Sequence, residues 1–159
     1  MTVTSANSIA IRTRNALQAA FRTITVANGY DITIALQSND VLVGNWVDPE
    51  NKKSFPYVHI GNLKTDYAGQ HLPSHTDYPT ITMDITAFVK DSIDREARAD
   101  LLAVALCKAG MVEYTLGGLV WNSFYDSVET YEDTQTQGLG VVLISWRMKA
   151  QHPIGEING

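Results

Sequence analysis

The sequence contains one cysteine, Cys107, and no hydrophobic run long enough to cross a bilayer. A single thiol excludes an intramolecular disulfide, and its place in the apolar run LLAVALCKAG favours a buried, unreactive side chain. A spanning helix needs about 18 consecutive apolar residues, and the start MTVTSANSIAIRTRN lacks the apolar core of a secretory signal. We therefore expect a soluble protein that is made in the cytoplasm and stays out of the membrane.

Recognisable motifs of catalysis and ligand binding are also missing. No serine lies in a G-x-S-x-G sequence, and Gly117-Gly118 does not open a helix after a strand as a phosphate loop does. His71, His75 and Asp77 form H-x3-H-x-D, a set of side chains that suits zinc or iron. Pro73 opposes the helix that would place both histidines on one face, which favours a solvated loop. We expect no enzyme activity, no cofactor and no metal.

Positive charge is scarce and unevenly placed. The chain has 12 lysines and arginines against 17 acidic residues, a net charge of −5, which argues against general nucleic-acid binding. Residues 1–30 contain Arg12, Arg14 and Arg22 and no acid, whereas the remainder has 9 basic and 17 acidic residues. This uneven distribution of charge has two interpretations. Either oppositely charged surfaces of neighbouring subunits meet head to tail, or the distribution arose by chance.

Two helices are predicted. The first runs from a cap at Ser5 or Ser8 to residue 26 and ends at Asn28-Gly29, where positive φ is tolerated. Helical spacing gives it one apolar stripe. The stripe consists of Ile9, Ala16, Leu17, Ala20, Phe21 and Ile24.

The second helix is predicted over residues 93–109, with Ser92 as its cap and Gly110 just past its end. Residues 101–107 are all apolar, so they cover more than one face of a helix. Either the helix is buried on two sides of a single core, or Leu102 and Leu106 pack against a partner subunit.

Alternating apolar residues predict strands in the remaining sequence. These strands are expected at residues 30–36, 41–47, 57–60, 80–90, 119–131 and 139–150. Together they predict one α+β domain over residues 1–159. It would have a mixed or mainly antiparallel sheet of about five to six strands, with two helices packed on one face.

Three surface segments are candidates for contacts with other subunits. Residues 62–79 have no periodicity and form a loop long enough to act as an assembly arm, carrying His71 and His75. Glu129, Glu132 and Asp133 make the closing hairpin acidic near its tip. Residues 151–159 are expected to be a flexible tail.

In this arrangement the chain resembles the tail terminator, or tail-completion, proteins of tailed bacteriophages. The resemblance is one of pattern over most of the chain. Its matching segments are RTRNALQAAFRTITVANGY, FPYVHIGN, ITMDITAFV, ARADLLAVALCKAG and VVLISWRMKA. No functional residue carries over, because these proteins have no invariant catalytic residue.

The resemblance implies a virion protein at the tube–neck junction, assembled in the host cytoplasm. Copies of it would form a ring, typically a hexamer, that caps the tail tube, stops its polymerisation and docks to the neck or head-completion protein. DNA would pass through the ring without specific binding, and a negative channel wall would repel its phosphates. Alternatives are another neck or tail-tube protein, or a small-ligand or metal-binding domain that uses the loop at 62–79.

Overall fold

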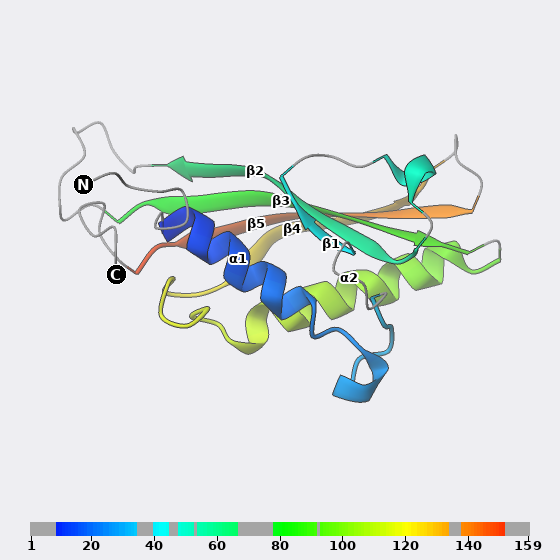
Figure 1. The fold of residues 1–159 in the computed structure, drawn as a ribbon, viewed down its shortest axis with the longest axis horizontal. Coiled ribbons are helices and arrows are strands. Elements are labelled where there is room, and N and C mark those ends of the chain that lie inside the picture. Colours follow the sequence, from blue (N-terminus) through cyan, green and yellow to red (C-terminus); the bar gives the residue numbers. More distant parts are fainter. Residues whose placement is uncertain are drawn as a thin grey trace.

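The computed structural model describes residues 9–34, 40–44, 48–52, 54–66, 78–91, 93–133 and 138–151. These residues contain two α-helices and five strands, which confirms the predicted α+β class (Figure 1). In chain order they are α1 Ile9–Phe21, β1 Val41–Val43, β2 Tyr57–Asp66, β3 Thr80–Lys90, α2 Arg95–Val112, β4 Phe124–Glu132 and β5 Leu139–Lys149. Neither helix in the described part is long and apolar enough to cross a membrane.

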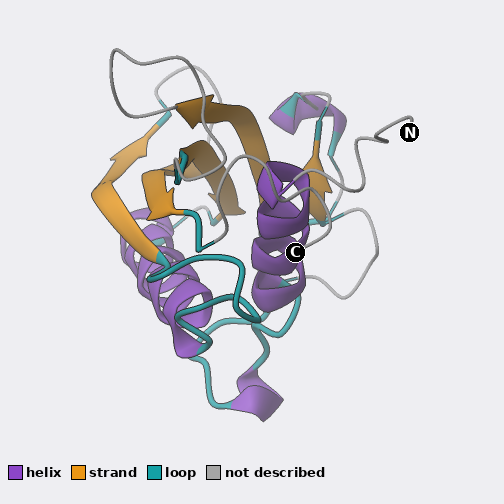
Figure 2. Cartoon of the chain, turned by 90° about the vertical axis from the view of Figure 1, so that its left-hand side faces the viewer, coloured by secondary structure: helices purple, strands orange, loops and turns teal. Residues whose placement is uncertain are grey.

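The strands form one sheet in the order β1-β2-β3-β5-β4. β1 runs parallel to β2, and every other neighbouring pair is antiparallel. Both helices lie on the same side of the sheet, as the end-on view in Figure 2 shows. α1 contacts β1 and β2, whereas α2 contacts β3, β5 and β4, so each helix covers a different edge of the sheet.

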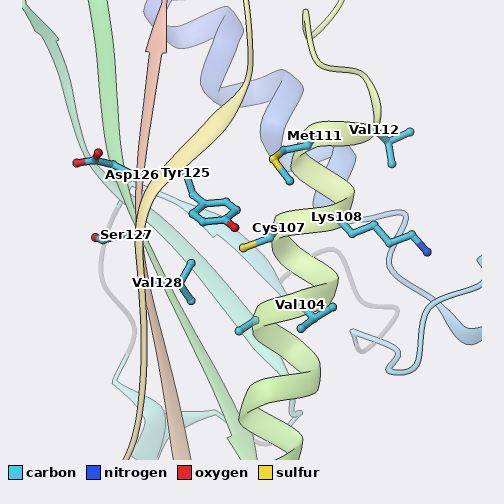
Figure 3. Close-up of a pocket in the computed structure, with 10 residues that line it drawn as sticks. Val104, Cys107, Lys108, Met111, Val112, Tyr125, Asp126, Ser127 and Val128 are labelled. Atoms are coloured by element: carbon cyan, nitrogen blue, oxygen red, sulfur yellow. The ribbon is translucent and has the colours of Figure 1, made fainter.

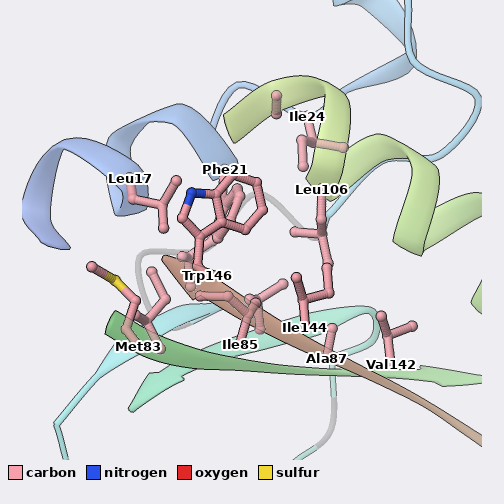
Figure 4. Packing of buried hydrophobic residues seen from close by; sticks show 14 of the residues in the cluster. Leu17, Phe21, Ile24, Met83, Ile85, Ala87, Leu106, Val142, Ile144 and Trp146 are labelled. Atoms are coloured by element: carbon pink, nitrogen blue, oxygen red, sulfur yellow. The ribbon is translucent and has the colours of Figure 1, made fainter. Parts of the chain in front are cut away.

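The main core lies between the helices and the sheet. Alternate residues of β3 and β5, among them Ile85 and its cross-strand partner Ile144, are buried beneath the helices. Trp146 on β5 is fully buried, and its ring meets the Phe21 ring edge-on at 6.0 Å (Figure 4). A smaller cluster comprises Tyr57, Phe88, Leu139 and Val141.

The first helix is shorter than predicted. It ends at Phe21, and residues 26–28 form a separate 3-10 turn that Gly29 closes with φ of 90°. Residues 30–34 are not a strand, although Ile32 and Ile34 are buried as an alternating pattern requires. Burial alone produced the strand pattern here, since these residues lie in no sheet ladder. Residues 1–8, with both predicted caps, and residues 35–39 lie outside the described part.

The second helix begins two residues later than predicted, at Arg95, and continues to Val112, because Gly110 extends the helix instead of ending it. A Cβ on Gly110 would lie 2.4 Å from Trp146 Cη2, so the glycine makes room for the indole. At the start of the helix, the Asp91 carboxylate accepts hydrogen bonds from the backbone N–H groups of Ile93 and Asp94. Ser92, the predicted cap, lies outside the described residues.

The ends of several strands also differ from the predicted ones. β2 extends to Asp66, so the first part of the predicted loop at 62–79 is strand. β4 begins at residue 124, not 119, because the preceding residues form a turn in which the N–H groups of Leu119 and Val120 donate to Thr115 O. β3 and β5 match their predicted ranges closely. Residues 45–47, 67–77 and 152–159 are outside the described part.

Candidate subunit interface

Of the predicted interface residues of the first helix, Arg12 and Arg14 lie on α1, at the β1–β2 side of the sheet, and Arg22 directly follows the helix. Arg22 is exposed, and Arg12 and Arg14 are half-buried. Arg12, Asn15, Ala19 and Arg22 follow one another at helical spacing and form a surface stripe with the small Ala19 near its middle. We call these four residues the α1 stripe.

Leu102 and Leu106 were predicted as candidate interface residues, but both are fully buried in the main core of this chain. The monomer alone therefore accounts for these two side chains. The helix keeps other apolar residues at its surface: Leu101, Val104, Met111 and Val112 are exposed. These four, and not the two buried leucines, are available to a partner.

The predicted acidic residues lie on and just after β4. Glu129 is exposed in the strand, Glu132 forms a partly exposed ion pair with Arg95 at 3.1 Å, and Asp133 follows. Asp126 adds a fourth acid, and residues 119–138 contain no lysine or arginine. His71 and His75 lie outside the described residues, so the structure does not place them beside this surface.

β4 is an edge strand with apolar side chains on both faces. Phe124, Tyr125, Val128 and Tyr131 are each between 38% and 46% exposed, so neither face of the strand is covered. The sequence contains a signal for these two uncovered faces, because bulky residues at 124, 125, 128 and 131 do not alternate as they do in a strand with one buried face.

A groove of about 810 Å³ separates β4 from α2 (Figure 3). Tyr125 and Val128 point from β4 toward α2, whereas Asp126 and Ser127 point away from it. The register shift between Tyr125 and Ser127 is a bulge, and it puts residues 125 and 128 on the same face. On α2 the groove is lined by the small side chains of Ala103 and Cys107, which leave space a larger residue would fill.

Cys107 lines this groove, and its surroundings do not activate the thiol as a nucleophile. Burial raises the pKa of the Cys107 thiol to about 11, so the side chain is protonated at neutral pH. Within the described residues, no group of three or more His, Cys, Asp and Glu side chains could hold a metal ion. The groove can therefore bind an apolar surface, but it offers no activated nucleophile.

We refer to β4 together with the exposed side of α2 as the β4–α2 surface. Its groove is lined mainly by apolar side chains and also by Lys108, while Asp126 points away from it. At the start of α2, Asp94, Glu96 and Asp100 line a hollow of about 320 Å³ with Glu132, whose carboxylate is paired with Arg95. Large exposed apolar patches rimmed by polar residues typically mark interaction sites in soluble proteins.

Comparison with models of protein families finds no match for this sequence, and comparison with curated proteins finds none. Solved structures give a match: a chain from a structure described as "Virion of native gene transfer agent (GTA) particle" has a similar fold, with a TM-score of 0.54. The two chains share 14% identity over 87% of this chain and 96% of the other. The chain therefore shares its α+β fold, over nearly the whole of both chains, with a component of a virion.

Proposed function

We propose that this chain is a structural protein of a phage-like virion, and that copies of it close into a ring that caps the tail tube. The observation that carries the proposal is the shared fold with a chain of a gene transfer agent virion, which spans 96% of that chain. The match covers almost the entire chain from the gene transfer agent particle, so the two chains are similar as whole subunits.

The surface properties support a subunit that assembles. The β4–α2 surface leaves an edge strand and an apolar groove uncovered in the monomer. The bulge and the acids of β4 oppose direct strand pairing, so a partner would cover the groove and not add a strand to the sheet. A ring of such subunits, typically a hexamer, would stop tube growth and dock to the neck or head-completion protein.

The charge of the chain suits a ring around a DNA path. At a net charge of −5, a channel wall made from this protein would repel phosphates and let DNA pass without specific binding. The ring would stand at the junction of tube and neck in the virion, after assembly in the host cytoplasm.

A tail-tube or other neck protein is the second candidate, because an uncovered edge also suits open polymers. A heterologous contact forms a closed ring when its rotation closes and an open filament when it does not. The candidates therefore differ in the product of assembly, which can be seen directly.

Light scattering across a concentration series, with negative-stain images of the large species, tests the proposal. Closed rings of one size with a central hole are the expected result. Adding the rings to growing tubes of the tube protein from the same virion should then stop elongation. Open tubes of this chain alone would transfer the assignment to a tube protein, and rings that leave tube elongation unchanged would contradict the capping role.

A further inference from the structure

We infer that one end of the sheet, which we call the aromatic end, binds the acidic start of α2 of a second copy of this chain. The inference rests on the proposed function, since a ring needs one repeated contact, and it assigns that contact to two surfaces. The aromatic end consists of three exposed rings and two bases: Tyr78, Trp121, Phe124, Arg147 and Lys149. The acidic start consists of one apolar residue and three acids: Ile93, Asp94, Glu96 and Asp100.

The aromatic end presents its rings where β3 begins and β5 finishes. Trp121 is 54% exposed, and its ring centroid lies 6.4 Å from that of Tyr78. Trp121 lies beside β5, because its backbone N–H donates to Lys149 O at 3.0 Å. Phe124 is also exposed and is the cross-strand partner of Arg147. Aromatic residues and arginine are enriched at protein interfaces relative to the rest of the surface.

Arg147 and Lys149 make the centre of the aromatic end positive. Both point to the side of the sheet that the helices leave open, because Trp146 and Met148, which alternate with them, are buried in the main core. Neither base forms an ion pair with any residue that the structure describes. Their charges are therefore available to acids of a partner.

The acids on this face lie on the strands beside β5. Asp66 on β2 lines a hollow of about 470 Å³ with Lys64 and Arg147. Asp126 on β4 points away from α2, and Asp84 lies further along β3. β5 itself carries no acid from its first residue to its last. The positive charge at the aromatic end is thus local to β5, next to the rings.

The acidic start of α2 has the complementary character. Ile93 is 84% exposed, more than any other large apolar side chain in the described residues. Asp94, Glu96 and Asp100 line a hollow of about 320 Å³ beside it. None of these three acids pairs with a base in the described part, because the two arginines nearby pair with other acids. Acids at a helix start also stabilise the helix, but this does not account for the exposed isoleucine.

The two surfaces match in their apolar and in their charged groups. In the proposed contact Ile93 packs against the rings of Tyr78 and Trp121. Arg147 and Lys149 reach the carboxylates of the hollow. Either surface facing its own copy would instead oppose charges of one sign, which is costly at an interface. The contact is therefore head to tail.

The positions of the two surfaces allow the contact to repeat. β3 runs from the aromatic end toward the acidic start, and its 11 residues span about 34 Å. Figure 1 shows α2 beginning beyond the far end of β3. A subunit that is bound at one end still has its other end available for the next copy. Such a heterologous contact produces a ring when the rotation closes.

Two charge-reversed variants test the inference. One carries Arg147→Glu with Lys149→Glu, and the other carries Glu96→Lys with Asp100→Lys. Each variant alone opposes like charges at every contact, so it should associate about 100-fold more weakly than the wild type. All four side chains are exposed, so circular dichroism should match the wild type.

Mixing the two variants gives the decisive result. The reversed aromatic end of one variant faces the reversed acidic start of the other, and the two unchanged surfaces also face each other. Rings should therefore reappear and contain both variants in equal numbers, as light scattering and mass spectrometry of the isolated rings can show. Asp31→Lys with Glu129→Lys changes the net charge equally outside both surfaces and is the control, which should assemble like the wild type.

The apolar part of the contact needs a separate variant. Ile93→Ser removes the exposed side chain without a change of charge and should weaken the association of subunits about 10-fold. Val26→Ser is the matched control, because Val26 is also largely exposed but lies in the turn that follows α1. Equal effects of the two substitutions would contradict the packing of Ile93 against the rings.

Three further outcomes would overturn the inference. They are a mixture that stays monomeric, single variants that assemble like the wild type, and a wild-type chain that is monomeric even at about 1 mM. Rings that persist in both variants would reject this contact and leave the proposed function standing. Conversely, restored assembly of the mixture in a protein whose wild type forms open filaments would support the contact and reject the tube-capping role.

Discussion

The indole N–H of Trp146 donates a hydrogen bond of 3.0 Å to the Ser123 hydroxyl, and both residues are fully buried. The Ser123 hydroxyl in turn donates to the backbone oxygen of Gly110 at 2.7 Å. This chain of two hydrogen bonds connects β5 to the last turn of α2 through the segment that leads into β4. It fixes the end of the helix that forms one wall of the groove.

Ser123→Ala should lower the free energy of unfolding by about 1–3 kcal/mol, because it leaves the buried Trp146 N–H without its acceptor. Urea unfolding measures the change. In a Trp146→Phe background, which has no N–H to satisfy, the same substitution should have a smaller effect. Ser127→Ala, on the exposed side of β4, is the control and should change little. Equal losses in both backgrounds would contradict this role for the hydrogen bond.

Gly110→Ala should destabilise the protein although alanine is the better helix former. The added Cβ would lie 2.4 Å from Trp146 Cη2 and 2.5 Å from Cζ2. Overpacking of this kind typically costs about 1–3 kcal/mol, against a gain in helix propensity of about 1 kcal/mol. Trp146→Phe removes the clashing ring, so Gly110→Ala should be tolerated better in that background. A stabilised single variant in thermal unfolding would refute the explanation.

Removing the buried ion pair should have a larger effect than removing an exposed one. Lys52 Nζ lies 3.1 Å from the Asp40 carboxylate, and the Asp40 side chain is fully buried. Lys52→Met should cost about 3–5 kcal/mol, because it removes the lysine that is paired with a buried carboxylate. Arg95→Met, which breaks the partly exposed pair with Glu132, should cost at most about 1 kcal/mol. Denaturant titration of both variants checks the order, and similar losses would contradict it.

The Asp91 carboxylate should make stability depend on pH in the acid range. The backbone N–H groups of Asp94 and Ile93, and then the charge of Arg98, hold the pKa of Asp91 below its ordinary value of 3.8. A depressed folded pKa stabilises the protein above the unfolded pKa, and this contribution is lost as the pH falls through the folded pKa.

Asp91→Asn keeps an oxygen acceptor but does not titrate, so it isolates the effect of the charge. Urea midpoints of wild type and variant should differ at pH 7 and converge as the pH falls below about 3.8. A difference between the two proteins that stays constant from pH 7 to pH 2 would be inconsistent with the lowered pKa.

Cys107 should react slowly with thiol reagents in the folded protein. With a pKa of about 11, roughly one thiol in a thousand is ionised at pH 8, compared with about a quarter in an unfolded chain. Iodoacetamide modification should accelerate steeply between pH 8 and pH 11. The urea-unfolded protein is the control, and equal rates in both states at pH 8 would contradict a buried thiol.

The sequence predicts most reliably the strands with one buried face. In β3 and β5 the alternation of side chains follows directly from contact with the helices, so their bounds were predictable. The segment at 30–34 was not, because Ile32 and Ile34 alternate for burial without joining a ladder. An alternating pattern in the sequence indicates which residues are buried, whereas strand pairing depends on partners that are distant in the sequence.

The candidate interface was predictable only in its charges. Arginines without nearby acids and a run of acids without bases are visible in the sequence. The groove cannot be predicted from the sequence, because it forms only where Ala103 and Cys107 of α2 face the bulged strand β4 in the folded chain. Leu102 and Leu106 look like candidates for a partner contact in a run of apolar letters, but the fold buries them and exposes Val104 instead.

The place of β5 in the sheet also controls when the groove between β4 and α2 can form during synthesis. β4 is joined to the rest of the sheet through β5, which follows it in the chain and lies between it and β3. Until residues 139–149 have emerged from the ribosome, β4 has no neighbour on which to form its edge. The wall of the groove that β4 provides can therefore form only after β5 has been made, although β4 precedes β5 in the chain.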